Sequence, residues 1–460
     1  MSTFRENLQN IITEPSNIGK VVVISGMSGS GKNFVASILA KNNYAFIDKY
    51  VTRPFRPVEI SDIKAGRNIG IRAVSGLYND GEKTLQEQEN ANEQRKQAFL
   101  DLRLPLAYIN YGNYYGFSID QINNYIMNGR NVVIIVNDIG VIRDLKDIYG
   151  DNCLACYVHR SNPKKREIFM EIARQRGDTE ESAERRYQKA IKDFDRYTNN
   201  ISLYDYTILN TETGTDRLST MLQDLSSIEP KAVHREKNMK KQKARIYVFT
   251  GSPGSGKDDA LETVRVQGIL HSIIMPKHTT RLRKADDGEE LICRDDEKFN
   301  IELCDLQYEN YGNLYGIDTN ELRERVEAGI SSSLIVSNRG ALETLKAKFP
   351  EELVTIYIQG ISKEEYIVQQ KNHLDEEYVK RRIQEYEKAD ELYYNRWLDF
   401  NHIIINNGDL GDMRLQIDSI MRYYEGDREL SVDKCLAYTQ KANQYIARFA
   451  RNRNNQKDKE

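Results

Sequence analysis

The stretch VVVISGMSGSGK, residues 21–32, carries the clearest structural signal in this 460-residue chain. It opens with an unbroken run of valine and isoleucine, which predicts a buried strand. A glycine-rich loop follows, and NFVASILAKN at 33–42 then has apolar residues at helical spacing. A strand, a G-x-x-x-x-G-K loop and a helix in this order predict a P-loop, in which backbone N–H groups and the helix N-terminus bind a phosphate.

The same arrangement occurs again as IYVFTGSPGSGK at 246–257. Four further pairs of stretches recur in the same order: VTRPFR (51–56) with TTRLRK (279–284), NYGNYYG (110–116) with NYGNLYG (310–316), AERRYQKA (183–190) with VKRRIQEY (379–386), and TILN (207–210) with IIIN (403–406). The offsets between the copies are 225, 228, 200, 196 and 196 residues. The chain is therefore predicted to be a doubled unit. The drop from 228 to 200 indicates an insertion in the first copy, which we interpret as an exposed helical segment at about 60–100.

Each copy is predicted to be an α/β domain with a parallel sheet flanked by helices. Short continuous apolar runs, such as NVVIIVND (131–138) and LVTIYIQ (353–359), are typical of strands covered on both faces. The expected organisation is a first domain at 19–228, a basic linker at 229–243, a second domain at 244–425 and a C-terminal helical tail at 426–460. The linker is interpreted as solvated, with a patch for phosphate or nucleic acid as the alternative.

Composition excludes several classes of protein. Sixty-six Lys and Arg nearly balance sixty-nine Asp and Glu, giving a net charge of −3, which argues against a nucleic-acid partner. No apolar run approaches the roughly 20 residues of a membrane span, and the N-terminus does not resemble a signal peptide. Five scattered cysteines favour a reducing, cytoplasmic location. Cys153 and Cys156 form a C-x-x-C inside an apolar run, so we expect core thiols rather than a metal or redox pair.

Both P-loops supply candidate phosphate ligands. They are Gly26, Ser28, Gly29, Ser30, Gly31, Lys32 and Asn33 in the first copy, and Gly251, Gly254, Ser255, Gly256, Lys257 and Asp258 in the second. Lys32 and Lys257 would neutralise phosphate charge during catalysis. Asn33 and Asp258 stand where a Ser or Thr hydroxyl usually ligates Mg²⁺, so these two are the candidate metal ligands.

The ordered set of P-loop, TRPFRPVE (52–59), YGNYYG (111–116) and RQRGDTEESAERR (174–186) resembles guanylate kinase. The resemblance implies a P-loop kinase fold in each copy, with a monophosphate-binding lobe and an arginine-bearing lid. It also implies ATP and Mg²⁺ as cofactors and GMP or a similar monophosphate as acceptor. GSGKD (254–258), SNRG (337–340) and IINNGD (404–409) of the second copy are similar to ribose 1,5-bisphosphate phosphokinase as well.

The same resemblance suggests residues that bind the acceptor. Those implied in the first copy are Arg53, Arg56, Glu59, Tyr115, Ser118 and Asp138, and those in the second are Arg281, Lys284 and Tyr315. Two guanidinium groups can hold a phosphate dianion bidentately. Asp138 has an alternative interpretation as a helix-capping carboxylate. Asp287 and Glu290 both remain candidates for the acid of the second copy.

The lid stretch supplies three candidate catalytic arginines, Arg174, Arg185 and Arg186, which would stabilise charge on the transferring phosphoryl group. The alternative is a solvated helix with pairs such as Glu181 with Arg185. The glutamate that would recognise guanine is missing, because 104–109 reads LPLAYI. Support for phosphate binding is therefore stronger than support for guanine selection.

The sequence thus predicts a nucleoside monophosphate kinase that transfers the γ-phosphoryl group of ATP, with GMP the favoured acceptor and no covalent intermediate. Two alternatives stay open. One is a ribose-bisphosphate-type sugar phosphate kinase, and the other is a catalytically weak tandem module that binds nucleotide or a protein partner. A homo-oligomer, or a protein partner bound through the tail, also stays open.

Overall fold

The computed structural model describes residues 18–55, 57–66, 70–74, 85–110, 112–159, 166–175, 179–210, 215–223, 225, 244–268, 272–285, 287–288, 290–310, 312–370, 376–406 and 408–425. The predicted linker 229–243, the predicted tail 426–460 and Arg56 lie outside these residues. The chain forms two compact units, each containing one of the P-loop sequences. No helix in the described ranges combines the length and the apolar character needed to cross a membrane.

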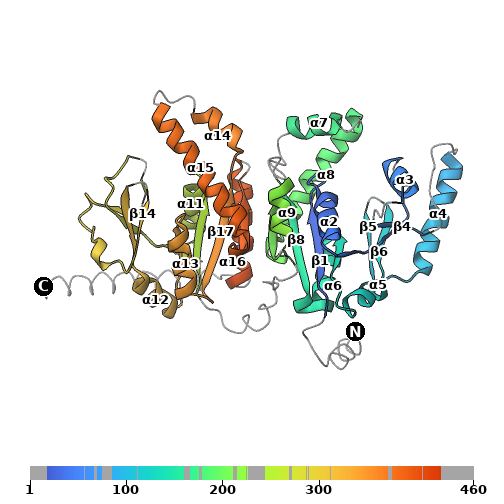
Figure 1. Cartoon of the computed structure of the whole chain (residues 1–460), viewed down its shortest axis with the longest axis horizontal. Helices are drawn as coiled ribbons and strands as arrows, with labels where there is room; N and C mark the ends of the chain where they lie inside the picture. Colours follow the sequence, from blue (N-terminus) through green and yellow to red (C-terminus); the bar gives the residue numbers. More distant parts are fainter. Residues whose placement is uncertain are drawn as a thin grey trace. The chain divides into compact units, whose positions relative to one another are not determined.

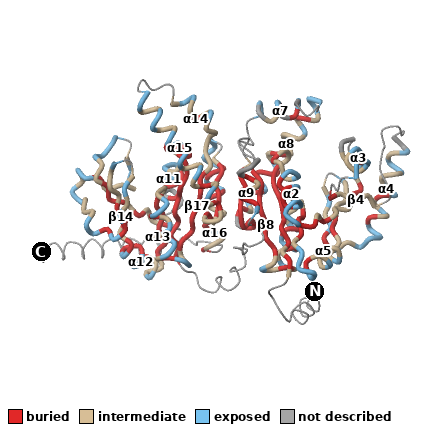
Figure 2. Tube along the Cα trace, in the orientation of Figure 1, coloured by how far each residue is buried: buried red, intermediate tan, exposed pale blue. Residues whose placement is uncertain are grey.

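The first unit is built on a five-stranded parallel sheet (Figure 1). Its strands, in spatial order, are β2 (Ala45–Phe46), β7 (Val132–Ile135), β1 (Val21–Gly26), β8 (Cys153–His159) and β9 (Tyr206–Leu209). The central strands β1 and β8 are buried along their whole length, as Figure 2 shows for β8. Helices on both faces exclude water from these strands, so their sequences can be continuously apolar. The helices are α2 (Lys32–Lys41), α5 (Ile119–Ile126), α6 (Ile139–Tyr149), α7 (Arg166–Gln175), α8 (Glu180–Thr198) and α9 (Thr215–Gln223), with 3₁₀ turns η2 (Gly150–Asn152) and η3 (Ile201–Leu203).

A second, small sheet of four strands follows β2 in the chain and belongs to the same unit. Its order is β4 (Ile71–Ala73), β3 (Lys49–Val51), β6 (Asn113–Phe117) and β5 (Leu106–Asn110). Strands β3 and β6 run antiparallel, so the residues just before Arg53 lie beside the Tyr-Gly sequence at 115–116. Helices α3 (Pro57–Lys64) and α4 (Leu85–Asp101) lie between the strands of this sheet in the chain, α3 after β3 and α4 before β5.

The second unit repeats both sheets in the same order. Its parallel sheet is β11 (Ser272–Ile274), β16 (Ser331–Ile335), β10 (Ile246–Gly251), β17 (Leu353–Gln359) and β18 (His402–Ile405). Its small sheet is β13 (Leu291–Cys293), β12 (Lys277–Thr279), β15 (Asn313–Ile317) and β14 (Leu306–Asn310). The helices are α11 (Lys257–Gly268), α12 (Thr319–Glu327), α13 (Arg339–Lys348), α14 (Lys363–Gln370), α15 (Glu376–Arg396) and α16 (Leu410–Glu425), with 3₁₀ turns η6 (Ile301–Leu303) and η7 (Trp397–Asp399).

The predicted fold class is confirmed in both units. The helix expected in the insertion is α4, and the second unit has only the 3₁₀ turn η6 between β13 and β14. Strand β4, in contrast, has a counterpart in β13, so the extra length of the first unit lies mainly around α4. Cys153 and Cys156 are fully buried in β8, where burial raises the pKa of Cys153 to about 12. They are core thiols, as predicted.

Candidate active site

The glycine-rich loops leave β1 and β10 in a conformation that only glycine adopts readily. Gly29 and Gly31 have φ values of 85° and 90°, and Gly254 and Gly256 have 73° and 89°. These left-handed residues turn successive N–H groups to one side, which creates a concave anion site at the start of a helix. A Cβ atom on Gly31 would lie 2.1 Å from the side-chain nitrogen of Asn210, so the loop is also packed too tightly for any larger residue.

The side chains of the P-loop lysines fold back and form hydrogen bonds with carbonyl oxygens of their own loops. Lys32 donates hydrogen bonds of 2.7 Å to the carbonyl oxygens of Gly26 and Met27. Lys257 makes the matching bonds to Gly251 and Ser252, at 3.0 and 2.7 Å. Burial lowers the pKa of each lysine to about 8. Phosphate oxygens could replace these carbonyl acceptors and would raise the pKa of each lysine again, since an opposite charge favours the charged form.

The candidate metal ligands follow directly on these lysines. Asn33 and Asp258 are both exposed in the first turn of their helices. Each could hold Mg²⁺ from the side of the loop, although no group of three His, Cys, Asp or Glu in the described part of the chain could hold a metal by itself. The hydroxyls of Ser30 and Ser255 are buried without a hydrogen-bond partner, and each lies beside the first glycine of its loop.

In the first unit, Arg53 is held by an acid and a tyrosine. Its guanidinium donates to both carboxylate oxygens of Glu59, at 2.8 and 2.6 Å. Both side chains are largely buried, at 17% and 12% exposure. Burial opposes the charge of Arg53, but hydrogen bonds with Glu59 and Tyr115 raise its pKa above the ordinary value. The structure thus brings together three of the predicted acceptor residues.

The second unit resolves which acid plays this part. Arg281 donates to Asp287 at 2.7 Å, and its hydrogen bonds with Asp287 and Tyr315 outweigh burial and raise its pKa. Glu290 instead accepts from the backbone of Gly288. Lys284 is exposed, and its backbone N–H donates to Asp287, so its main chain supports the pair.

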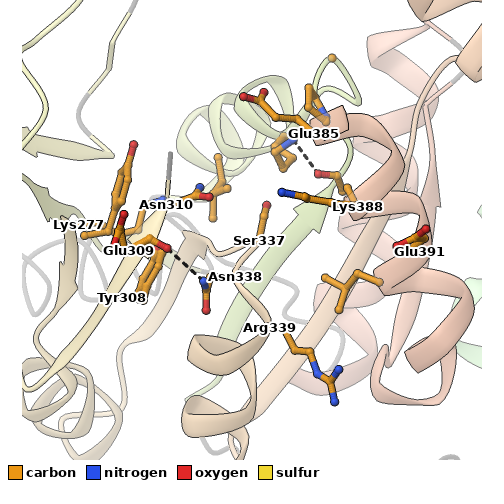
Figure 3. A pocket seen from close by; sticks show the side chains of 18 of the residues that line it. Lys277, Tyr308, Glu309, Asn310, Ser337, Asn338, Arg339, Glu385, Lys388 and Glu391 are labelled. Carbon is orange, nitrogen blue, oxygen red and sulfur yellow. Dashed lines mark hydrogen bonds between the residues drawn. The ribbon is translucent and has the colours of Figure 1, made fainter. Parts of the chain in front are cut away.

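A cavity of about 830 Å³ joins the two ends of the second site. It is lined on one side by Lys257 and Asp258 of the P-loop and on the other by Tyr315 of the small sheet. Figure 3 shows Lys277 and Tyr308 of the small sheet facing Lys388 and Glu385 of α15 across this space. The side chain of Arg339 points away from the other labelled residues and pairs with Glu343 at 3.0 Å. The cavity is large enough for a nucleotide-sized ligand.

Two lysines in the small sheets are absent from the predicted set. Lys49 begins β3 and Lys277 begins β12, and each lies four residues before the arginine of its unit. The rings of Tyr108 and Tyr115 stack with their centres 5.2 Å apart, and those of Tyr308 and Tyr315 stack at 5.7 Å, with the Lys277 nitrogen over the Tyr315 ring. The repeat offset of 228 residues, which aligns Arg53 with Arg281, also aligns these lysines and could have identified them.

Two of the predicted acceptor residues act as helix caps. Asp138 accepts from the N–H of Val141 at 3.0 Å, which is its alternative interpretation. The Asp138 carboxylate also lies near enough to Tyr108 to help raise the pKa of that phenol, after burial. Ser118 accepts from the N–H of Gln121 at 3.2 Å and caps α5. Their proposed contacts with an acceptor remain predictions.

The lid arginines lie on helices α7 and α8. Arg174 pairs with Glu171 and Arg185 with Glu181, both at 3.6 Å and both on exposed faces. This is the arrangement of a solvated helix, so the structure does not bring these two to the P-loop. Arg186 is half-buried on α8. Its counterpart at the repeat offset of 196 is Arg382, which lines the cavity of the second unit and pairs with Glu385 at 2.6 Å.

Two polar residues support the first P-loop without having been predicted. Asn137 donates to the carbonyl of Gly26 at 2.7 Å and accepts from its N–H at 3.2 Å. The side chain of Asp193, 4% exposed on α8, accepts from Asn137 and opposes the lowering of the Lys32 pKa by burial. The only sequence signal for either residue was the polar end of the strand at 131–138.

Comparison with known proteins finds guanylate kinases. The guanylate kinase of Clostridium tetani is 25% identical over 211 residues, which are 46% of this chain and 85% of that protein. The guanylate kinase of Mycoplasmoides gallisepticum is also 25% identical over 211 residues, covering 46% and 91%. A crystal structure of guanylate kinase from Anaplasma phagocytophilum is 20% identical, with a TM-score of 0.29, and covers 43% of this chain and 95% of that chain. No family model matches the sequence.

Proposed function

Because the chain contains a guanylate kinase-like domain, we propose that it is an ATP-dependent phosphotransferase acting on a nucleoside monophosphate, with GMP the favoured acceptor. The observation that carries this proposal is the cavity of the second unit, in which P-loop Lys257 and small-sheet Tyr315 line one space. A donor phosphate on the loop and an acceptor phosphate near the tyrosine would then meet within it. The first unit has the same loop and the same Arg-acid-Tyr group.

The chemistry would rest on positioning and electrostatics. The loop N–H groups and Lys32 or Lys257 would bind the β- and γ-phosphates of ATP. Arg53 or Arg281, oriented by its acid, and Tyr115 or Tyr315 would hold the acceptor phosphate in line. Mg²⁺ held near Asn33 or Asp258 would neutralise phosphate charge.

Cations of α7 and α8 in the first unit, and of α15 in the second, would stabilise charge in the transition state. In the second unit, Arg382 lines the cavity. In the first, Arg186 occupies the corresponding position, and Arg174 and Arg185 would have to move from their exposed pairs to reach the phosphates. Closing a lid on substrate binding can produce such a movement and excludes water from the transfer.

A coupled assay of ATP consumption tests the proposal with a panel of nucleoside monophosphates and phosphorylated ribose compounds. We expect turnover with at least one nucleoside monophosphate, and most with GMP. Turnover with a sugar phosphate alone would assign the chain to that alternative. ATP binding without turnover of any acceptor would support the nucleotide-binding module and refute the kinase.

A further inference from the structure

Lys49 and Lys277 occupy equivalent places on the small sheets. Lys49 lies opposite Phe117 in the antiparallel pairing of β3 with β6, because Val51 pairs with Tyr115. Lys277 has the same register in β12, where Thr279 pairs with Tyr315. Residues two apart on a strand share a face, so each lysine lies on the same face as the tyrosine proposed to bind the acceptor.

The ammonium of Lys277 is buried but faces the cavity. The residue is 8% exposed, lines the 830 Å³ cavity and places its nitrogen 5.6 Å from the centre of the Tyr315 ring. The Lys49 nitrogen lies 5.7 Å from the centre of the Phe117 ring. Within the described ranges, no ion pair joins either ammonium to a carboxylate, whereas Arg53 and Arg281 are each paired with an acid.

Burial acts against the charge of both lysines, and neighbouring cations add to it. For Lys277, the carboxylates of Glu290 and Asp258 favour the charged form, and Lys257 and Arg281 oppose it. Lys49 is opposed by Lys32, Arg53 and Lys189, with Glu59 alone favouring its charge. Burial, the largest cause, and the neighbouring cations lower the pKa of Lys49 to about 7, and burial lowers that of Lys277 to about 8.

The nearby carboxylates offset this only in part, because the pKa of each lysine stays lowered. A contact with a ring face stabilises an ammonium only weakly, whereas burying an ammonium without an ion-pair partner costs more than that contact returns. A methionine would fill the same space without that cost. Both units nevertheless have a lysine here, although they differ at the acid, at the second basic residue and at the helix cap. The arrangement becomes favourable once an anion is bound between the lysine and its neighbouring cations.

We propose that Lys49 and Lys277 bind the phosphate of the acceptor. They are cations with which no carboxylate forms an ion pair within the described ranges. The identity of the acceptor in this assignment rests on the proposed function, whereas the binding of an anion by these lysines rests on the structure alone. Since the charge of each arginine is balanced by its acid, the lysine determines the affinity for the phosphate dianion. The acceptor is therefore recognised mainly by its phosphate and less by its base.

Titrations of the full chain with GMP, followed by calorimetry, and with inorganic phosphate, followed by ³¹P NMR, test this assignment. The variants are Lys49→Met, Lys277→Met and the double variant, with exposed Lys64→Met and Lys298→Met as matched controls. We expect each single variant to weaken one site about tenfold or more for both ligands, and the double variant to weaken both. Lys→Arg variants should recover part of the affinity, while the controls bind as wild type.

The results separate this assignment from the proposed function. Unchanged affinity for GMP and phosphate in the double variant would overturn the lysine assignment, even if wild type phosphorylates GMP. Loss of phosphate binding in the double variant, in a chain that phosphorylates no nucleoside monophosphate, would support the lysines and refute the kinase proposal. Circular dichroism and thermal melting show whether each variant folds, and we expect the methionine variants to melt at or above the wild-type temperature.

Discussion

The guanidinium of Arg53 is bound at two points by the carboxylate of Glu59, with N–O distances of 2.8 and 2.6 Å. Arg281 and Asp287 form the corresponding pair in the second unit, at 2.7 Å. Such a pair fixes the guanidinium plane before any ligand arrives, so little side-chain entropy is lost on binding. The acid that orients the arginine also cancels its charge, which leaves the nearby lysine as the stronger attraction for an anion.

Glu59→Gln tests this orienting role. The substitution removes one charge from a largely buried pair, so we expect the free energy of unfolding of the first unit to fall by about 1–3 kcal/mol. The KM for the acceptor should rise more than the KM for ATP, because the guanidinium of Arg53 is no longer held in a single orientation. Urea unfolding and steady-state kinetics measure the two effects.

Glu181→Gln is the matched control, since Glu181 and its partner Arg185 are 82% and 73% exposed. Exposed pairs contribute little, so neither stability nor acceptor KM should change measurably. Equal effects of the two substitutions would show that the burial of the Arg53–Glu59 pair has no importance.

Gly256→Ala should disable the second P-loop. The new Cβ atom would lie 2.3 Å from the side-chain nitrogen of Asn406, which itself donates to the carbonyl of Ser255 at 3.0 Å. The loop must shift to relieve this contact, and we expect ATP affinity at this site to fall about tenfold or more.

Gly408→Ala supplies the comparison for that loss. Its φ of 85° is also left-handed, but nothing lies within 4 Å of the added atom. Both substitutions carry the conformational cost of about 1–2 kcal/mol, whereas only Gly256→Ala carries the clash. Calorimetric ATP titrations should show normal affinity for Gly408→Ala, and a similar loss in both variants would contradict the packing argument.

Adjacent arginines on α15 offer another matched pair. Arg382 lines the cavity, while Arg381 is 61% exposed. In a Lys32→Ala background, which isolates the second site, Arg382→Met should reduce kcat about tenfold or more because it removes a cation near the transferring group. Arg381→Met should leave kcat unchanged. A larger loss for Arg381→Met would place the catalytic cation on the other face of the helix.

The stability of Lys49→Met should depend on pH in a defined direction. The pKa of Lys49 is about 7 in the folded chain and 10.5 for an ordinary lysine. Between these values the unfolded chain binds more protons, so this lysine makes stability rise with pH. Below about pH 7, Lys49 is protonated in both the folded and the unfolded chain, so the full cost of burying the ammonium lowers the stability of the folded chain. In urea unfolding, the gain in stability of the variant over wild type should be larger near pH 6.5 than near pH 9.5; a gain independent of pH would contradict a buried, unpaired ammonium.

Local sequence predicted the P-loops and the buried parallel strands because each rests on a short pattern. Glycines at 29 and 31 and the apolar run at 21–24 are sufficient for that prediction, and the doubling of the pattern strengthened it. The partner of Arg281 could not be chosen between Asp287 and Glu290, since both are within reach of a flexible side chain. Only the turn that brings the Lys284 N–H to Asp287 decides it.

The lysines and the lid show a different limit. A lone lysine at the start of a strand is normally solvated, and the partial burial of Lys49 and the burial of Lys277 depend on how the small sheet packs. The arginines at 174 and 185 were predicted to be catalytic, with surface pairs as the alternative, and in this structure Glu171 and Glu181 pair with them. Sequence spacing identifies residues on one helix face, but it does not show what that face contacts.

Direct transfer of labelled phosphate from [γ-³²P]ATP to GMP is the measurement that tests the account most directly. The wild-type chain should form labelled GDP, Lys32→Ala and Lys257→Ala should each remove the contribution of one unit, and the chain carrying both should form none. Binding of ATP by the wild type with no labelled nucleoside diphosphate, from GMP or any other monophosphate, would contradict it.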